Sequence, residues 1–298
     1  MLDGDLLHRF LFEELPIRGH IVRLDASWRA AIEHQDYPRP VSDALGQAMA
    51  ASVLMAGSLK FEGRLSLQIE AAGPMRLLLA QCTHRHAIRG VVRHQGVPAE
   101  VRCIADLCGR GQLAVTIEQE GRTESYQGVV SLELPELSAC LEQYFERSEQ
   151  LPSRLMLVST PERAAGLLLQ RVASGGVGEE ALPAADDAWR RIGLFAATLS
   201  TTELLQLPCR ELLRRIFPED DIRLFTGTPV WFQCSCSRER VAGILQSLGE
   251  DELQALLRER DDVEVRCEFC NRAWHFDAVD VAGLFSVGPS QQAPRGLH

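Results

Sequence analysis

Four cysteines near the C-terminal end of the chain have the type and spacing of metal ligands. Cys234 and Cys236 form a C-x-C pair, Cys267 and Cys270 form a C-x-x-C pair, and residues 237 to 266 separate the two pairs. Zinc accepts four sulfur ligands tetrahedrally, and each short pair can occupy two adjacent vertices. The spacing therefore predicts one zinc ion bound by four thiolates.

Other interpretations compete with a plain structural zinc site. An iron–sulfur cluster is disfavoured, because common ferredoxin motifs carry three or four cysteines in close succession and this chain has no such run. A redox switch stays open: a Cys234–Cys236 bond would be strained and reducible, whereas C-x-x-C pairs oxidise readily. Positive charge favours the thiolate form. Four arginines beside the pairs supply such charge: Arg238, Arg240, Arg266 and Arg272.

A second group of potential ligands lies nearer the N-terminus. Cys82, His84 and His86 alternate and would share one face of a strand, so a further metal site is conceivable. It would have only three ligands, and a polar exposed strand edge explains these residues better. The functional interpretation is therefore the weaker one here.

The other cysteines are expected to be structural. Cys103 and Cys108 are predicted to be incidental thiols in a loop. Cys140 lies on the apolar face of a predicted helix and should be a small core residue. Cys209 follows Pro208 in a helical region, where burial is favoured over an accessory thiol role. The sequence leaves open whether any of these, or Cys82, joins the redox chemistry.

Length and composition limit the classes of function. A chain of 298 residues suggests more than one domain, and 46% hydrophobic residues suffice for a sizeable core. The formal charge of −10 disfavours a nucleic-acid partner. Nine cysteines, an odd number, favour a reducing compartment, and we expect a cytoplasmic protein. No signal peptide or membrane span is expected. No nucleotide-binding motif or catalytic triad is evident, so we expect no enzyme.

The elements before the cysteines indicate an α+β domain. Short β-branched or alternating segments predict strands, and apolar residues at helical spacing predict two helices. The strands are expected at residues 18 to 24, 64 to 70, 75 to 81 and 111 to 117, and the helices at 41 to 60 and 137 to 147. Without regular βαβ alternation, the core domain is expected to hold mixed, largely antiparallel sheets.

A helical linker and a small domain are predicted to follow. Residues 174 to 187 are rich in Gly, Pro, Ala and acids, and short amphipathic helices come next, one opened by a Ser200–Glu203 capping box. Such short helices are marginal alone, so they should dock on the core and undock easily. We expect domains at 1 to 175, 176 to 232 and 233 to 298. The last domain should begin with a helix from 237 to 248. A second helix, capped by residues 247 to 250, should end near residue 260, and a hairpin should follow at 263 to 276.

The cysteine region, CSCSRERVAGILQSLGEDEL followed by VRCEFCNRAWHF, resembles the C-terminal signature of the 33 kDa heat shock protein family of redox-regulated holdase chaperones. The resemblance covers nearly the whole chain. The segments that look like the family's core domain are RGHIVRLD (18 to 25), LKFEGRLSLQIEAAGPMRLLLAQC (59 to 82), GRGQLAVTIE (109 to 118), YQGVVSLE (126 to 133), LEQYFERSEQLPSRLML (141 to 157) and AAGLLLQRV (164 to 172).

The resemblance implies an α+β core, a helical linker, a zinc domain, and zinc ligation by Cys234, Cys236, Cys267 and Cys270. It implies an ATP-independent chaperone that oxidation activates, with disulfide formation and zinc release, and that protects unfolded proteins from aggregation under oxidative and heat stress. We expect Cys234–Cys236 and Cys267–Cys270 disulfides, because each pair is held at adjacent vertices. Unfolded client proteins are the expected partners, with a homodimer in the oxidised form. A thiol-disulfide oxidoreductase and a zinc-ribbon binding module are the alternatives.

Overall fold

The structure is a computed structural model of the protein. The chain divides into two compact units, Met1–Gln233 and Cys234–His298. The structure describes residues 4–101, 103–122, 125–172 and 182–286. The greater part of the predicted Gly- and Pro-rich linker lies outside these residues. No helix within the described ranges is long and apolar enough to cross a membrane.

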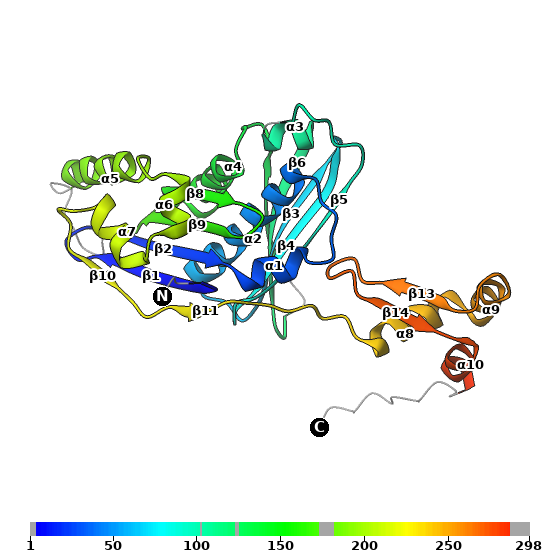
Figure 1. The fold of residues 1–298 in the computed structure, drawn as a ribbon. Coiled ribbons are helices and arrows are strands. Elements are labelled where there is room, and N and C mark those ends of the chain that lie inside the picture. The colour runs from blue at the N-terminus through cyan, green and yellow to red at the C-terminus, as the bar shows by residue number, and fades with distance from the viewer. Residues whose placement is uncertain (1–3, 102, 123–124, 173–181, 287–298) are drawn as a thin grey trace, which may run out of the picture. The chain divides into compact units, whose positions relative to one another are not determined.

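The first unit contains two six-stranded sheets, whose strands β1 to β9 are coloured from blue to green in Figure 1 and whose later strands are yellow. The first sheet has the order β10-β1-β2-β9-β8, with β11 also paired to β1, and the second has the order β12-β5-β4-β3-β6-β7. Every strand pair in these two sheets is antiparallel except the β12–β5 pair, which is parallel. These largely antiparallel sheets confirm the predicted fold class. The strands are β1 (Leu6–Phe12), β2 (Ile17–Leu24), β3 (Gly63–Ala71), β4 (Met75–Thr83), β5 (Ala87–His94), β6 (Gly111–Gln119), β7 (Ser125–Ser131), β8 (Ser153–Ser159), β9 (Ala164–Arg171), β10 (Ile222–Leu224), β11 (Thr228–Pro229) and β12 (Trp231–Phe232).

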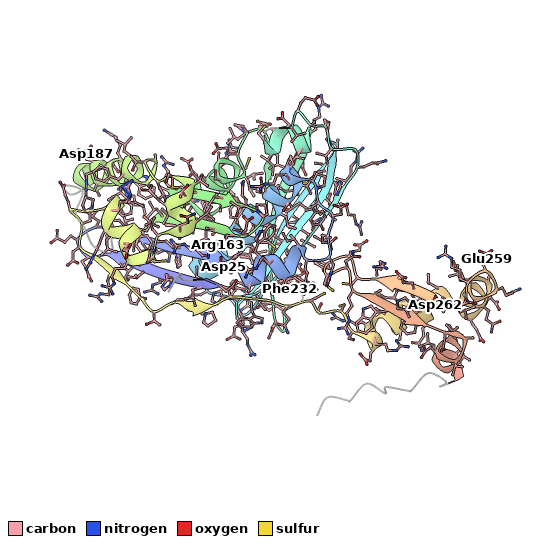
Figure 2. All side chains as sticks on the ribbon, in the orientation of Figure 1. Asp25, Arg163, Asp187, Phe232, Glu259 and Asp262 are labelled. Carbon is pink, nitrogen blue, oxygen red and sulfur yellow. The ribbon has the colours of Figure 1, made fainter. Side chains whose placement is uncertain are left out.

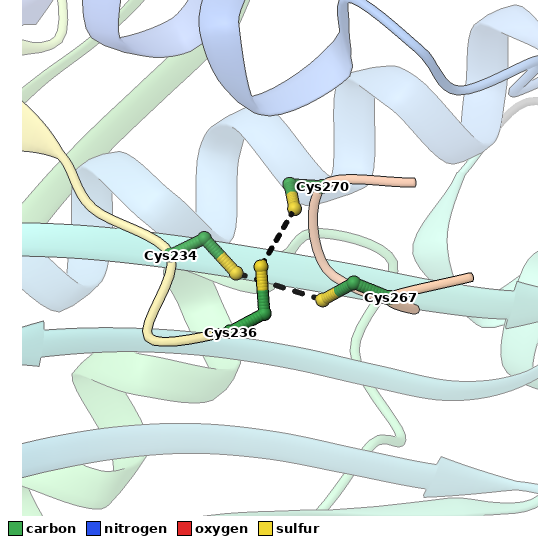
Figure 3. A group of neighbouring side chains, drawn as sticks. All are labelled: Cys234, Cys236, Cys267 and Cys270. Atoms are coloured by element: carbon green, nitrogen blue, oxygen red, sulfur yellow. Dashed lines mark hydrogen bonds between the residues drawn. The ribbon is translucent and has the colours of Figure 1, made fainter. Parts of the chain in front are cut away.

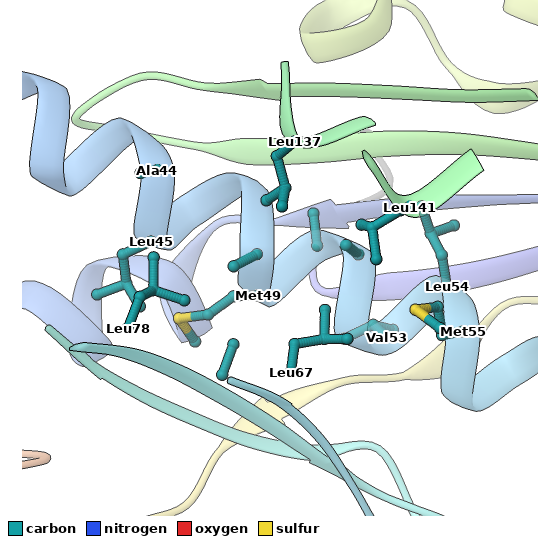
Figure 4. Packing of buried hydrophobic residues seen from close by; sticks show 14 of the residues in the cluster. Ala44, Leu45, Met49, Val53, Leu54, Met55, Leu67, Leu78, Leu137 and Leu141 are labelled. Carbon is teal, nitrogen blue, oxygen red and sulfur yellow. The ribbon is translucent and has the colours of Figure 1, made fainter. Parts of the chain in front are cut away.

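The helix α2 (Arg39–Ser58) lies between the two sheets and forms the centre of the main core. Leu45 and Met49 pack towards Leu67 and Leu78 of the second sheet, and Leu54 packs against Gly166 of β9 in the first (Figure 4). Because strands cover it on opposite sides, nearly every residue of this helix is buried. The helix predicted for residues 41 to 60 is thereby confirmed.

The helices α5 (Leu182–Ala196), α6 (Thr201–Gln206) and α7 (Cys209–Ile216) cover the other face of the first sheet (Figure 1). The Ser200–Glu203 capping box is formed as predicted. We call the apolar side chains between these helices and the sheet the linker cluster. Its buried members are Phe10, Phe12, Ile17, Ile21, Ala165, Leu167 and Leu169 of the sheet, and Ile192, Ala196, Leu204, Leu205, Cys209, Leu212, Leu213, Ile216 and Phe217.

Two arginines of the core also hold the end of α6. Arg23 of β2, which is only 2% exposed, donates from Nε to the Leu204 carbonyl at 2.8 Å. Arg163 donates from Nη1 to the Leu205 carbonyl at 3.2 Å and forms a 2.6 Å ion pair with Asp25, its neighbour in Figure 2. Positive charge at a helix C-terminus is favourable. Neither arginine was predicted to have this role, although a charge inside the apolar strand β2 was a usable signal.

The remaining helices of the first unit are short. They are α1 (Ala26–Ile32), α3 (Ile104–Cys108) and α4 (Leu137–Tyr144), which continues as a π-helical turn, η1 (Phe145–Glu149). The first part of the helix predicted for residues 137 to 147 is confirmed. A helix, rather than the predicted loop, occupies the segment between Cys103 and Cys108, because the Cys103 and Asp106 side chains form a reciprocal cap.

The second unit contains a hairpin and three helices. They are α8 (Arg238–Leu248), α9 (Glu250–Glu259), β13 (Val263–Arg266), β14 (Ala273–Phe276) and α10 (Ala278–Ser286). The predicted cap at residues 247 to 250 was wrong. Ser247 lies inside α8 and donates to the Ile244 carbonyl, whereas Gly249, with φ of 98°, precedes α9. Glycine adopts that backbone conformation readily, so the break between the helices needs no side-chain cap.

Candidate metal centre

The first cysteine pair lies on the segment that enters α8. Cys234 and Cys236 precede Ser237, which begins the helix as its N-cap and accepts a hydrogen bond from the Arg240 amide at 3.3 Å. The Arg240 side chain donates back to the Ser235 carbonyl at 2.8 Å. These bonds fix the turn into the helix and hence the direction in which the two thiols point.

The second pair lies in the turn of the β13–β14 hairpin. The Cys267 amide donates to the Arg272 carbonyl at 3.0 Å, and the Asn271 amide donates to the Cys267 carbonyl at 2.7 Å. Asn271 has φ of 53°, a left-handed conformation that asparagine tolerates better than most residues. The tight turn brings the thiols of Cys267 and Cys270 to the same side, as the hairpin prediction required.

The four thiols converge on one point (Figure 3). The Sγ atoms of Cys234 and Cys267 are 3.6 Å apart, those of Cys236 and Cys270 are 3.5 Å apart, and all four lie within 4.8 Å of one another. Four sulfurs about 2.3 Å from a tetrahedral zinc ion would be about 3.8 Å apart, whereas a disulfide is about 2.05 Å long. The arrangement is that of a reduced four-sulfur metal site.

The electrostatics of the cluster call for a cation. Burial raises the pKa of the Cys234 thiol to about 11, and burial also raises the pKa of Cys236 and of Cys270. Burial acts in the same direction on Cys267, but the amides of Cys270 and Phe269 outweigh it and lower the Cys267 pKa. Three of the four thiols thus resist ionisation, so a bound divalent cation is what would hold them as thiolates.

The second unit has little else to stabilise it. Six buried apolar side chains form its core: Val241, Leu245, Leu253, Val263, Phe276 and Val281. Domains of this size seldom fold on such a core without disulfides or a metal. A metal ion bound by the cysteine cluster would cross-link this unit and add to so small a core.

The flanking arginines have partners other than sulfur. Arg238 pairs with Asp280 at 2.7 Å and lies over the Phe276 ring, and Arg272 lies over the Trp274 ring. Arg266 pairs with Glu264. They pack the scaffold around the site.

The other predicted ligand group is not assembled. Cys82 is fully buried in the main core, and burial raises its pKa. His84 and His86 lie in the turn after β4 ends at Thr83, so the three residues do not share a strand face as expected. Within the described part of the chain, the four C-terminal cysteines form the group that meets the geometric requirement for a metal.

The remaining thiols are largely enclosed. Cys140 is fully buried, as predicted, and burial raises its pKa. Cys108 is also fully buried, and burial raises its pKa to about 12. Cys209 is 1% exposed, in the linker cluster, whereas Cys103 is half-buried. The burial expected for Cys209 is confirmed.

Comparison with known proteins agrees with this architecture. The family model described as Hsp33 protein matches residues 5–277. The 33 kDa chaperonin of Nitrosococcus oceani is 46% identical over 287 residues, covering 96% of both chains, and that of Methylobacillus flagellatus is 40% identical over 286 residues, covering 95% of both. The crystal structure of the 33 kDa chaperonin from Thermotoga maritima superposes with a TM-score of 0.78 at 23% identity, over 95% of this chain and 98% of that one.

These findings cover both compact units. The family match begins just before β1 and extends past the hairpin that carries Cys267 and Cys270. The likeness to the Thermotoga maritima structure supports the fold, and the two relatives support the family over nearly the full length. The chain belongs to the Hsp33 protein family.

Proposed function

We propose that the protein is a redox-regulated, ATP-independent holdase chaperone that binds unfolded proteins and protects them from aggregation under oxidative and heat stress. The observation that carries the proposal is the convergence of four thiols within 4.8 Å in a unit with a very small core. The relatives' description as chaperonins supports the chaperone class. The thiol cluster supplies the reason for redox control.

The reduced site would hold one zinc ion through Cys234, Cys236, Cys267 and Cys270. Soft thiolate ligands in tetrahedral arrangement favour zinc over hard cations. Structural zinc contributes about 10 to 16 kcal/mol of binding free energy, comparable with the roughly 5 to 15 kcal/mol that keeps a whole domain folded. Loss of the ion should therefore unfold the second unit.

Peroxide would remove the ion by oxidising its ligands. Each disulfide forms from two thiols and one hydrogen peroxide, which is reduced to two waters, so two peroxides convert all four thiols. The nearest sulfurs in the reduced fold belong to different pairs, at 3.5 and 3.6 Å. Once the hairpin melts, however, only sulfurs close in sequence stay near each other. We therefore favour Cys234–Cys236 and Cys267–Cys270 as the final bonds.

The segment between α7 and Cys234 would transmit this change. Its strands are short: β10 and β11 pair with β1, and β12 pairs with β5 just before the first cysteine. A strap of two- and three-residue strands has a low local opening free energy. Unfolding of the second unit would let it fray towards α7 and loosen the helices over the linker cluster.

Loosened helices would expose the surface that binds clients. The sheet side of the linker cluster is apolar, with Phe10, Ile21 and Leu167 among its buried residues. We further propose residues 1 to 175 as the core chaperone domain, 176 to 232 as the redox-sensitive linker and 233 to 298 as the zinc domain. Oxidised chains would form a homodimer, and a reducing compartment such as the cytoplasm would keep resting chains inactive.

The alternative functions have less support. A thiol-disulfide oxidoreductase usually carries C-x-x-C at a helix N-terminus, where the thiolate is stabilised, but Cys267 and Cys270 lie in a hairpin turn. A zinc-ribbon module for nucleic acid would need concentrated basic charge, and the chain carries −10. Neither alternative accounts for the large apolar interface beneath α5 to α7.

Replacing one ligand tests the metal site. Cys267→Ser should abolish tight zinc binding, measured by metal analysis of the reduced full-length chain, and should unfold the second unit, because three thiolates leave the tetrahedron incomplete. Cys103→Ser, the same exchange at a half-buried thiol outside the cluster, should retain one zinc per chain. Near-stoichiometric zinc in the Cys267 variant would refute this ligand set.

Peptide mapping tests the disulfide pairing. After peroxide treatment and zinc release, digestion should recover Cys234 linked to Cys236 and Cys267 linked to Cys270, because short loops close most easily. A dominant bond between the two pairs, or one that includes the buried Cys209, would contradict the proposal.

Two substitutions in α5 test the gating role of the helices. Ile192 is fully buried in the linker cluster, whereas Leu194 in the same helix is 64% exposed. Ile192→Ala should weaken docking by about 2 to 5 kcal/mol. The variant should then suppress aggregation of a heat-unfolded client while still reduced and zinc-loaded. Leu194→Ala should behave like the wild type. A loosened Ile192 variant without this gain would mean that the helices are not the gate.

A further inference from the structure

A cavity of about 730 Å³ lies in the first unit. It opens where α2 ends, at Ala56 and Gly57, between β1 and β2 of the first sheet and the β4–β5 and β6–β7 turns of the second. Ligand pockets commonly have volumes of about 300 to 1,000 Å³. The cavity is thus large enough for a small organic or inorganic ligand, and the holdase proposal assigns it no role.

A buried histidine borders this cavity with no hydrogen bond of normal geometry. His20 of β2 is 2% exposed, and neither ring nitrogen has a partner at hydrogen-bond geometry among the described residues, although the Gly57 backbone lies close enough to raise the His20 pKa slightly against the effect of burial. Burial, followed by the charges of Arg18 and Arg9, lowers its pKa to about 4, so the ring is neutral near pH 7. A neutral imidazole has one donor and one acceptor, and leaving such a group unsatisfied costs about 1 to 3 kcal/mol. The site therefore calls for a ligand with both kinds of atom.

Cationic side chains surround the same opening. Arg9 lies directly opposite His20 in the β1–β2 pair, with its guanidinium held over the Phe225 ring at 4.7 Å. Lys60, just beyond α2, and Arg122, in the β6–β7 turn, also line the cavity. Among the described residues, none of the three forms an ion pair with a carboxylate. Three cations without such a pair, around a buried polar group, favour an anion.

Two carboxylates line the same opening. Glu62 and Glu120 are exposed to solvent, as are Arg9, Lys60 and Arg122, so three cations and two carboxylates leave this lining a formal charge of +1. His84 and His86 also line it, yet no metal site results, because His84 Nδ1 already accepts from the Gly63 amide at 3.0 Å. The histidines and carboxylates here also do not converge as metal ligands in the described part of the chain.

We propose that this cavity binds a small phosphate-bearing anion, with His20 at its floor and Arg9 and Lys60 on its walls. A singly protonated phosphate carries acceptor oxygens and one O–H donor, so it can satisfy both nitrogens of a neutral imidazole. A carboxylate at neutral pH can only accept. The planar guanidinium of Arg9 can donate to two oxygens of a tetrahedral phosphate at once. The volume leaves room for an ester group beyond the phosphate.

Titration of the reduced, zinc-loaded chain tests the site. Each titration would add inorganic phosphate, pyrophosphate or adenosine monophosphate, with chloride adjusted to keep the ionic strength constant. The His20 ring nitrogens would be followed by ¹H–¹⁵N NMR. At least one should shift the His20 resonances saturably. Tighter binding of adenosine monophosphate would identify an esterified ligand, and tighter binding of either inorganic ion a free phosphate.

Matched variants separate this site from general surface charge. Arg9→Gln and Lys60→Gln should each weaken binding about tenfold, equivalent to about 1.4 kcal/mol. Arg76 lies at the far end of β4 and outside the cavity. Arg76→Gln should therefore change the affinity for the anion less than about twofold, as expected for a surface charge. The proposal is overturned if no probe shifts His20 saturably, or if all three variants weaken binding equally.

Discussion

The mutual repulsion of four electron-rich sulfur atoms is the constraint on which the redox account depends. They lie within 4.8 Å of one another, burial opposes the ionisation of three of them, and only six buried apolar side chains form the core among the described residues of the second unit. Four thiolates so close together would need a cation at their centre. Under the proposed function, a change in the oxidation state of sulfur becomes a change in the folding of a whole unit.

The two apolar interfaces of the first unit differ in how fully their helices are enclosed. The helix α2 has a sheet on either side, so removing it would expose nearly all of its residues at once. The helices α5 to α7 are covered on one face only, and Leu194 already points to solvent. The hydrogen bonds from Arg23 and Arg163 to α6 fix the position of this helix. Because a buried charge regains hydration when the contact opens, these bonds contribute more to specific docking than to the free energy of docking.

Cysteine spacing and helical periodicity correctly predicted those features of the structure that depend on residues close together in the sequence. The cluster thiols, the helix α2 and the Ser200–Glu203 cap follow from spacing alone, and all are found. The strand β9 was missed as an element because both its faces are buried, which removes the alternation that marks a strand. The His20 cavity was also unforeseen, since it joins turns of one sheet to strands of the other. Such proximity depends on topology, which spacing along the chain does not encode.

Hydrogen exchange before and after peroxide tests most directly whether the metal cluster controls the linker helices. The account predicts that amides of α8, α9 and the β13–β14 hairpin lose protection as zinc leaves, that those of α6 and α7 follow, and that those of α2 stay protected. Protection of α6 and α7 that survives unfolding of the second unit would contradict the account. So would a second unit that remains protected after the ion has gone.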